Sequence, residues 1–215
     1  MVQLSWLFES VGNCAEYKQL LSHALNLQRE QGSDLQVART LRYLSDANRL
    51  LGLYKEGVRQ AREALEIHLQ VSDAVEQADC LNDLTWLLYT DKQLAASEEA
   101  ASRAIDLLPE LEKGGDFLVC QCHRILGKMY RSKGEREKAI GHFEVALGIA
   151  SSSNWHNELV GIHYSLAKFF SKEGRFDDAN SHVQQAKLHV ANNTYSVGLT
   201  TELQARFWYT VDHLA

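Results

Sequence analysis

The sequence predicts an all-α solenoid of about five helix-turn-helix repeats followed by one C-terminal helix. An alanine column recurs with steps of 40, 40, 42 and 40 residues, at Ala24, Ala64, Ala104, Ala146 and Ala186. A leucine column keeps the same steps, at Leu4, Leu44, Leu84, Leu126 and Leu166. Such a period is typical of repeat architectures. The single proline among 215 residues favours helices throughout.

Within each repeat, the first helix carries the leucine column and the second carries the alanine column. The residue after each leucine is small: Ser5, Ser45, Thr85, Gly127 and Ala167. We expect two helices to cross closely there, because a bulky side chain would push their axes apart. Three positions further on stand Phe8, Asn48, Leu88, Tyr130 and Phe170. A glycine then predicts a left-handed helix end at Gly12, Gly52, Gly134 and Gly174, with Lys92 as the exception.

The predicted repeats cover residues 1–32, 33–72, 73–113, 114–153 and 154–193, and a terminal helix covers 195–213, all in one domain. Ser33 and Asn154 are the expected N-caps of two first helices, and Asp73 with Glu76 resembles a capping box. A longer loop from Glu110 to Phe117 explains the 42-residue step. The first repeat starts late and the last helix lacks a partner. We therefore expect a fragment of a longer array, able to self-associate end to end through its terminal helices.

Composition narrows the function classes. Apolar residues are 45% and charged residues 23%, which indicates a soluble, folded chain, and the net charge of -6 argues against nucleic-acid binding. No apolar run is long enough to span a membrane, and no secretory signal is recognisable, so we expect no membrane association. Four cysteines without disulfide-scaffold spacing suggest reduced thiols and a cytoplasmic location.

The repeat pattern resembles the tetratricopeptide repeat (TPR) family. Its signature is matched best by Leu126, Gly127, Tyr130, Gly134, Ala139, Phe143 and Ala146, and nearly as well by Leu166, Ala167, Phe170, Gly174, Phe176, Ala179 and Ala186. The 40-residue length resembles kinesin light chain, LGN-type scaffolds and the C-terminal arrays of fungal STAND (NLR-like) signalling proteins. The resemblance implies a right-handed α-α superhelix whose first helices line a concave groove. It also implies a non-catalytic scaffold or sensor that binds a protein or peptide segment.

Applied to this sequence, the resemblance assigns a set of groove-facing residues that is rich in cations and aromatics. These partner-binding candidates are Arg39, Arg42, Tyr43, Arg49, Asn82, Asp83, Trp86, Tyr89, Arg124, Lys128, Arg131, Tyr164, Lys168 and Lys172. All the inward positions together hold eight Lys or Arg against four Asp or Glu, although the chain is acidic. A basic, aromatic surface suggests an acidic or phosphorylated partner segment. The alternative is that these arginines simply pair with carboxylates of neighbouring repeats.

The sequence gives little support for metal binding or catalysis. Cys120 and Cys122 lie two apart, so on a helix they point in different directions and cannot chelate one ion, and His123 beside them is interpreted as a packing residue. We predict no catalytic residue, metal or cofactor, because no phosphate loop or hydrolase motif is present. A peptide-gated regulatory receptor remains the alternative function. Peptide-binding 40-residue arrays place Asn before the leucine, whereas this chain has Tyr43, Asp83, Ile125 and Ser165.

Overall fold

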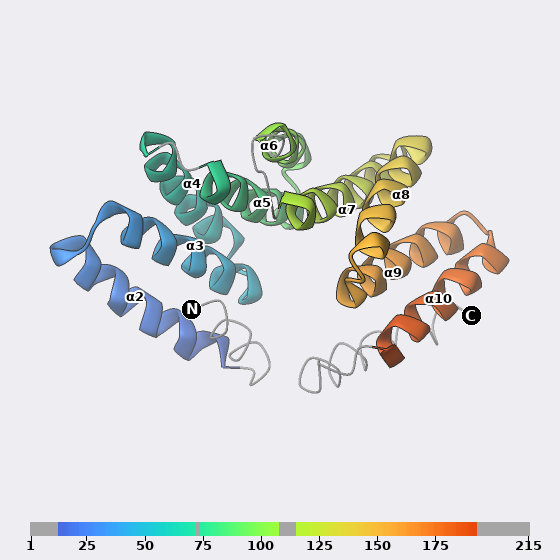
Figure 1. Ribbon diagram of the computed structural model, residues 1–215, viewed down its shortest axis with the longest axis horizontal. Helices are drawn as coiled ribbons and strands as arrows, with labels where there is room; N and C mark the ends of the chain where they lie inside the picture. The colour runs from blue at the N-terminus through green and yellow to red at the C-terminus, as the bar shows by residue number, and fades with distance from the viewer. Residues whose placement is uncertain (1–12, 72–73, 108–114, 193–215) are drawn as a thin grey trace. The chain divides into compact units, whose positions relative to one another are not determined.

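A computed structural model describes residues 13–71, 74–107 and 115–192. In these ranges the chain forms helices and no strands, which confirms the predicted fold class. The helices are α2 (Cys14–Gln31), α3 (Asp34–Leu50), α4 (Tyr54–Gln70), α5 (Ala74–Thr90), α6 (Leu94–Leu107), α7 (Gly115–Lys133), α8 (Arg136–Ser152), α9 (His156–Lys172) and α10 (Phe176–Asn192) (Figure 1). The predicted terminal helix at 195–213, Asp73 and the column residue Leu4 lie outside the described residues.

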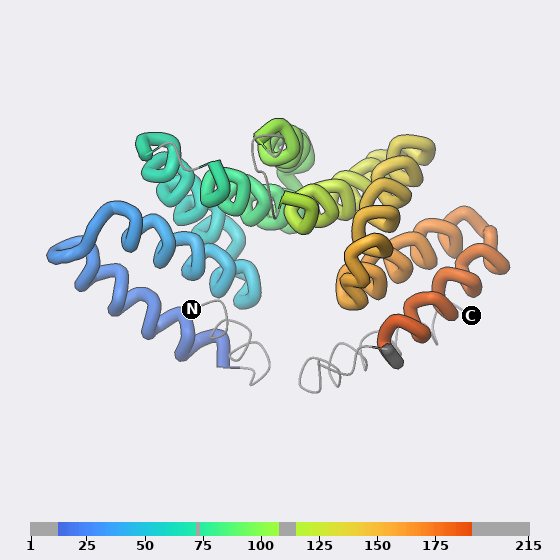
Figure 2. The backbone as a smooth tube through the Cα atoms, viewed as in Figure 1, coloured from blue at the N-terminus to red at the C-terminus, as the bar shows by residue number. Residues whose placement is uncertain are grey.

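The chain divides into two compact units, Met1–Ile125 and Leu126–Ala215, with the boundary inside α7. In unit 1, α2 packs on α3, α3 on α4, α4 on α5 and α5 on α6, and α3 also contacts α5. In unit 2, α8 packs on α9 and α9 on α10. Figure 2 shows that α9 and α10 run back along one another as a hairpin. The predicted repeat boundaries stay a prediction.

Both columns form the core. Leu44, Leu84, Leu126 and Leu166 are buried, as are Ala64, Ala104, Ala146 and Ala186, whereas Ala24 on α2 is half-buried. In two of the described repeats, the small residue after the leucine lies where the paired helix approaches. A Cβ on Gly127 would lie 2.7 Å from the ring of Phe143 on α8. In unit 1 the Ser97 hydroxyl on α6 donates to the Thr85 carbonyl on α5 at 2.9 Å. The close helix crossings are therefore real.

The helix ends follow the glycine prediction. Gly52, Gly134 and Gly174 have φ values of 74°, 79° and 73°, and Lys92 takes the same left-handed conformation with φ 65°. A side chain is strained there, because its Cβ crowds the backbone. Lys92 thus occupies a glycine position at some cost in stability.

One predicted N-cap is confirmed and one is wrong. The Ser33 hydroxyl accepts the Gln36 N–H, and the Gln36 side chain accepts the Ser33 N–H, which completes a capping box on α3. Asn154 does not cap α9. It has φ 54° in the turn after α8, and the N-cap position belongs to Trp155. Asn tolerates left-handed backbone better than most residues, so the turn uses it instead of the cap.

Candidate partner-binding site

The predicted partner-binding residues lie on α3, α5, α7 and α9, the first helices of their pairs. We call two sets of them the unit 1 face and the unit 2 face. The unit 1 face comprises Arg39, Arg42, Tyr43, Arg49, Asn82, Asp83, Trp86, Tyr89 and Arg124. The unit 2 face comprises Lys128, Arg131, Tyr164, Lys168 and Lys172.

Arg42 is the centre of an ion-pair cluster between α3 and α5. Its Nη1 lies 2.8 Å from Asp79 Oδ2 and 4.0 Å from Asp83 Oδ2, and its Nε lies 3.7 Å from Glu76 Oε2. The Arg39 Nε donates to the other oxygen of Glu76 at 3.0 Å. The partners are 34 to 41 residues apart in sequence, so the cluster joins neighbouring first helices. These cations are already neutralised within the fold.

Burial and neighbouring charges shift the pKa values of two members of this cluster. Burial lowers the pKa of Arg42, but the nearby carboxylates of Asp83, Asp79 and Glu76 outweigh it and raise the pKa above its usual value. Burial, with the charges of Asp46 and Asp79, raises the pKa of Asp83 to about 7, against the opposing effect of Arg42. The carboxylates thus crowd one another around a single guanidinium, and Asp83 holds its proton more readily than an exposed aspartate.

The other polar residues of the unit 1 face are also engaged within the unit. Arg49 donates to Asp46 Oδ1 at 2.9 Å from Nε and 2.7 Å from Nη2. Buried Asn82 donates to Gln121 Oε1 at 2.8 Å, which links α5 to α7. The Arg124 guanidinium lies 4.7 Å from the centre of the Trp86 ring. The alternative interpretation, pairing with carboxylates of a neighbouring repeat, thus fits Arg39 and Arg42, whereas Arg49 pairs within α3 and Arg124 contacts a ring.

The unit 2 face has different partners. The Arg131 Nη1 donates to the main-chain carbonyl of Ser165 at 3.4 Å, which joins α7 to α9. The Lys168 ammonium lies 5.2 Å from the centre of the Tyr164 ring, and Lys172 is exposed. A carbonyl and an aromatic ring do not cancel a cation's charge as a carboxylate does. The predicted inward positions of this unit, residues 128, 131, 132, 164, 165, 168, 171 and 172, contain no Asp or Glu.

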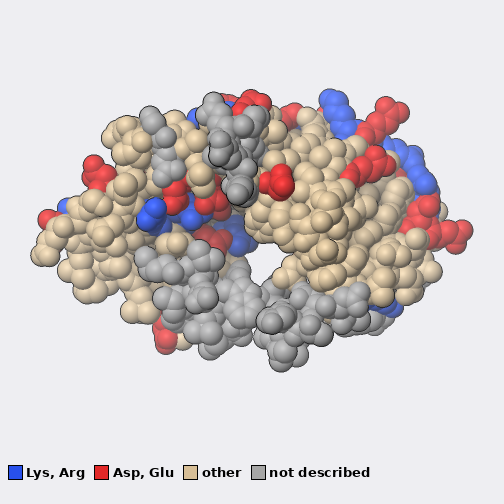
Figure 3. All heavy atoms as spheres, in the orientation of Figure 1, with Lys and Arg blue, Asp and Glu red and all other residues tan. Residues whose placement is uncertain are grey.

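The space-filling view shows how charged residues are distributed on the surface of unit 1. Figure 3 shows Lys and Arg atoms directly beside Asp and Glu atoms on the visible face over α3 and α5. The ion pairs of Arg39, Arg42 and Arg49 involve these two helices. The role of the fourteen predicted residues in binding a partner stays a prediction.

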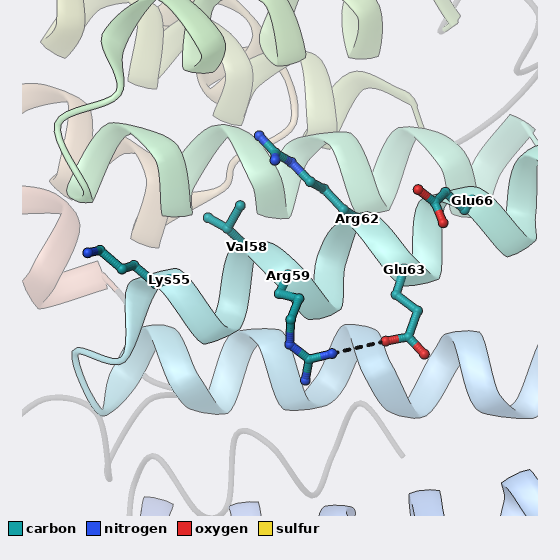
Figure 4. Close-up of a pocket in the computed structure, with 6 residues that line it drawn as sticks. All are labelled: Lys55, Val58, Arg59, Arg62, Glu63 and Glu66. Carbon is teal, nitrogen blue, oxygen red and sulfur yellow. Dashed lines mark hydrogen bonds and ion pairs between the residues drawn. The ribbon is translucent and has the colours of Figure 1, made fainter.

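A surface pocket on α4 was not predicted from the sequence. It has a volume of about 350 Å³ and is lined by Lys55, Val58, Arg59, Arg62, Glu63 and Glu66 (Figure 4). The Arg59 Nη1 lies 3.5 Å from Glu63 Oε2, and Arg29 on α2 also pairs with Glu63 at 2.5 Å. The lining is an ordinary mixed-charge helix surface with three cations and two anions, and we assign it no chemistry.

Cys120 and Cys122 are buried on α7. Burial raises the pKa of Cys122 to about 12, with Cys120 adding to the effect. The Cys122 Sγ lies 3.7 Å from Asn82 Oδ1. A thiol that is buried and protonated is a poor nucleophile and metal ligand, so these residues act in packing.

Sequence reasoning missed four histidines along the contact between α9 and α10, which we call the histidine seam: His156, His163, His182 and His189. The Nδ1 atoms of His163 and His182 are 3.0 Å apart, and those of His156 and His189 are 3.2 Å apart. The rings of His163 and His189 stack with centres 5.6 Å apart. The available signal was the seven-residue spacing on each helix, which places both histidines on one face.

Comparison with known proteins agrees with this architecture. Residues 123–153 match the tetratricopeptide repeat family. Protein KINESIN LIGHT CHAIN-RELATED 2 of Arabidopsis thaliana is 24% identical over 187 residues. The match covers 86% of this chain and 22% of that protein, so the chain spans about a fifth of the relative's length.

Two solved structures show the fold. BtubC (BKLC) from P. vanneervenii superposes with a TM-score of 0.67 at 18% identity, over 89% of this chain and 79% of that one. Rap protein complexed with competence and sporulation factor superposes with a TM-score of 0.79 at 17% identity, over 91% of this chain and 54% of that one. In the part of the chain that the structure describes, no helix has the length and apolar character to cross a membrane. The described residues have the fold of a tetratricopeptide-repeat array, and the chain is similar to kinesin light chain-type proteins.

Proposed function

We propose that this chain is a non-catalytic protein-interaction module that binds an acidic protein segment along the unit 2 face. Tetratricopeptide repeats generally mediate protein–protein interaction, which supports the coarse function. The observation that carries the finer proposal is the choice of partners for the predicted cations. Arg39, Arg42 and Arg49 of unit 1 pair with carboxylates at 2.7–3.0 Å, and Arg124 contacts a tryptophan ring. Arg131 and Lys168 of unit 2 contact a carbonyl and a tyrosine ring.

The charge difference favours one face for an acidic ligand. A carboxylate that approached Arg42 would have to compete with three carboxylates already in place. Near Arg131, Lys168 and Lys172 an incoming carboxylate meets cations whose described partners are uncharged. Tyr164 offers an aromatic surface beside them, as partner-binding hot spots often do. Four free thiols support our proposal of a reducing, cytoplasmic setting. End-to-end self-association through the terminal helices remains a prediction about residues outside the described ranges.

Charge reversal on the unit 2 face tests the proposal. Fluorescence anisotropy would measure binding of a labelled oligoglutamate peptide to the full chain and to Arg131→Glu/Lys168→Glu. We expect the double reversal to weaken binding at least about tenfold, and salt to weaken binding by the unchanged chain, because exposed charges are screened. Arg39→Glu/Arg49→Glu on the unit 1 face should weaken it less than about threefold.

Lys138→Glu on α8 is the matched control. It reverses a more exposed charge of unit 2 that lies on a second helix, where its Nζ pairs with Glu135 at 2.6 Å. Equal losses for Lys138→Glu and the double reversal would contradict a specific face. Absence of binding by the unchanged chain would contradict an acidic ligand.

A peptide-gated regulator is the second candidate. The observation that favours it is the TM-score of 0.79 to Rap protein, whose structure holds competence and sporulation factor. Under this hypothesis a short peptide would change the dimensions of the array. Small-angle scattering with and without candidate peptides would show a smaller radius of gyration on binding. Binding without compaction would leave the static interaction module as the function.

A further inference from the structure

The histidine seam constrains where protons can sit. At 3.0 and 3.2 Å, each Nδ1···Nδ1 contact is a hydrogen bond only if one nitrogen carries a proton and the other accepts it. Neutral rings satisfy this with opposite tautomers. When both rings of a pair are protonated, two N–H groups face each other and two positive charges lie close together. Protonating both rings of a pair therefore removes the hydrogen bond and adds charge repulsion.

The surroundings of the seam do little to offset such charge. His163 is buried, and the His182 ring stacks on Phe170 with centres 5.4 Å apart. On α10, Asp178 is the carboxylate that favours a charged His182, but Arg175 donates to it at 2.6 Å. On α9, Glu158 is also buried, and it lies closer to the start of the helix than His163 does.

The neighbouring helix α8 carries Arg136, Glu137, Lys138, His142 and Glu144 as its titratable side chains. His142 stacks on Tyr130, and Arg136 pairs with Glu173 at 2.9 Å. The charges that shift the seam histidines come from the other histidines and from Asp178. Positive charge in the seam thus meets mainly more positive charge.

We propose that the histidine seam makes the α9–α10 hairpin an acid-sensitive element, which opens in mild acid while the α5–α6 hairpin of unit 1 stays closed. The two hairpins form a natural comparison. The α5–α6 segment, residues 74–107, contains no histidine, whereas α9 and α10 contain four of the chain's nine.

The pH window follows from the sign of the shift. Burial, with His182 and His189 nearby, lowers the pKa of His163 to about 4, and burial also lowers the pKa of His182 and His189. Because these pKa values are lower in the folded hairpin than in the open one, the open state binds more protons below about pH 6.5. The hairpin is fully stable above that pH and loses stability down to about pH 4. His163 alone favours opening about 20-fold at pH 5 relative to pH 7.

Hydrogen exchange measured by mass spectrometry on the full chain tests the proposal. Exchange would be recorded at pH 7 and pH 5 with EDTA present, corrected for the intrinsic pH dependence. Protection of α9 and α10 peptides should fall on the order of 10- to 30-fold at pH 5, and that of α5 and α6 peptides less than about threefold. Equal changes in both hairpins, or unchanged protection in α9 and α10, would overturn the proposal.

Substituted chains and a direct titration distinguish the contribution of the histidine seam from other effects of acid on the protein. His163→Gln/His189→Gln removes one histidine from each pair and should reduce the loss to about threefold. His142→Gln, a histidine of the same unit outside the seam, should keep the full loss. In the unchanged chain, NMR should show at least one seam histidine titrating below about pH 5. Ordinary titration of all four in the folded state would overturn the proposal even if the variants fail to fold.

Discussion

Units 1 and 2 share the same helical repeat but place their polar side chains differently. In unit 1, Arg39 and Arg42 of α3 pair with carboxylates of α5, one repeat later. In unit 2, Arg131 reaches a carbonyl and Lys168 a tyrosine ring, while histidines fill the last hairpin. The same backbone thus supports one face where three arginines pair with carboxylates and another where Arg131 and Lys168 contact a carbonyl and a tyrosine ring. The repeat determines where a side chain stands but not what it contacts.

The two units also respond to pH in opposite directions. The raised pKa of Asp83 means that unit 1 gains stability as pH falls from about 7, because the folded state holds the proton more tightly. The lowered pKa of His163 means that unit 2 loses stability over nearly the same range. Four sets of substitutions would sharpen this comparison, taken from the largest expected effect to the smallest.

The largest expected effect comes from two core positions at which the sizes of the side chains differ between the two units. In unit 2, Phe143 packs against the small residue Gly127. The residues at the same repeat positions in unit 1, 42 residues earlier, are Ala101 and Thr85. Phe143→Ala should lower the free energy of unfolding by about 3–5 kcal/mol, because a fully buried ring leaves a cavity. Urea denaturation measures this loss.

A double-mutant cycle tests the exchange itself. Gly127→Thr alone should cost at least about 1–3 kcal/mol, because its Cβ would lie 2.7 Å from the Phe143 ring. Gly127→Thr/Phe143→Ala recreates the Thr85/Ala101 combination of unit 1 and should be at least about 1 kcal/mol more stable than the sum of the single losses predicts. Strict additivity would show that the two positions do not compensate.

The next effect compares the two arginines. Arg42→Ala leaves Glu76, Asp79 and Asp83 facing one another, and we expect it to cost about 2–4 kcal/mol of unfolding free energy. Arg131→Ala removes one hydrogen bond to a carbonyl and should cost less than about 1 kcal/mol. Chemical denaturation of both variants at pH 7 gives the values. A larger cost for Arg131→Ala would contradict the view that unit 1 uses its cations for stability.

Asp83→Asn isolates the pH response of unit 1. The folded-state pKa is raised, so the carboxyl stabilises the fold below about pH 4 relative to pH 8, and ionisation removes that stability as pH rises. The variant is neutral at every pH. It should therefore exceed the unchanged chain by about 1–2 kcal/mol at pH 8, with the difference vanishing near pH 4. Denaturation at several pH values measures the difference, and a variant less stable at pH 8 would contradict this account.

The smallest effect concerns the helix-end turns. Lys92→Gly in unit 1 should raise stability by up to about 1 kcal/mol, because glycine adopts the left-handed conformation without strain. Gly134→Lys in unit 2 is the reverse change at the equivalent position and should lower stability by about 1 kcal/mol. Thermal melting resolves both. Shifts of the same sign would mean that contacts of the lysine side chain outweigh backbone strain.

Sequence periodicity predicted the core because burial follows repeat position. Leu84 and Ala104 are buried since every helix of this kind must turn one apolar face toward its neighbours. Ser33 was predictable as a cap because its contact with Gln36 is local. Asn154 was not, because the same side chain suits a cap and a left-handed turn, and the preceding helix end decides between them.

The contacts between repeats were beyond such reasoning. Arg42 and Asp79 were both assigned to the inner face, but only their 2.8 Å separation showed that they neutralise each other. The seam histidines His163 and His182 stand 19 residues apart, and their contact depends on how α10 lies against α9.

By itself, then, the sequence determined the helical repeat, its register and which positions are buried, because local backbone preferences and the 40-residue period act along the chain. Only the tertiary structure decided which cations have uncharged partners and which histidine rings contact one another. Those properties depend on contacts of about 3 Å between side chains of different helices. Such contacts are set by the orientation of each side chain and not by its position in the repeat.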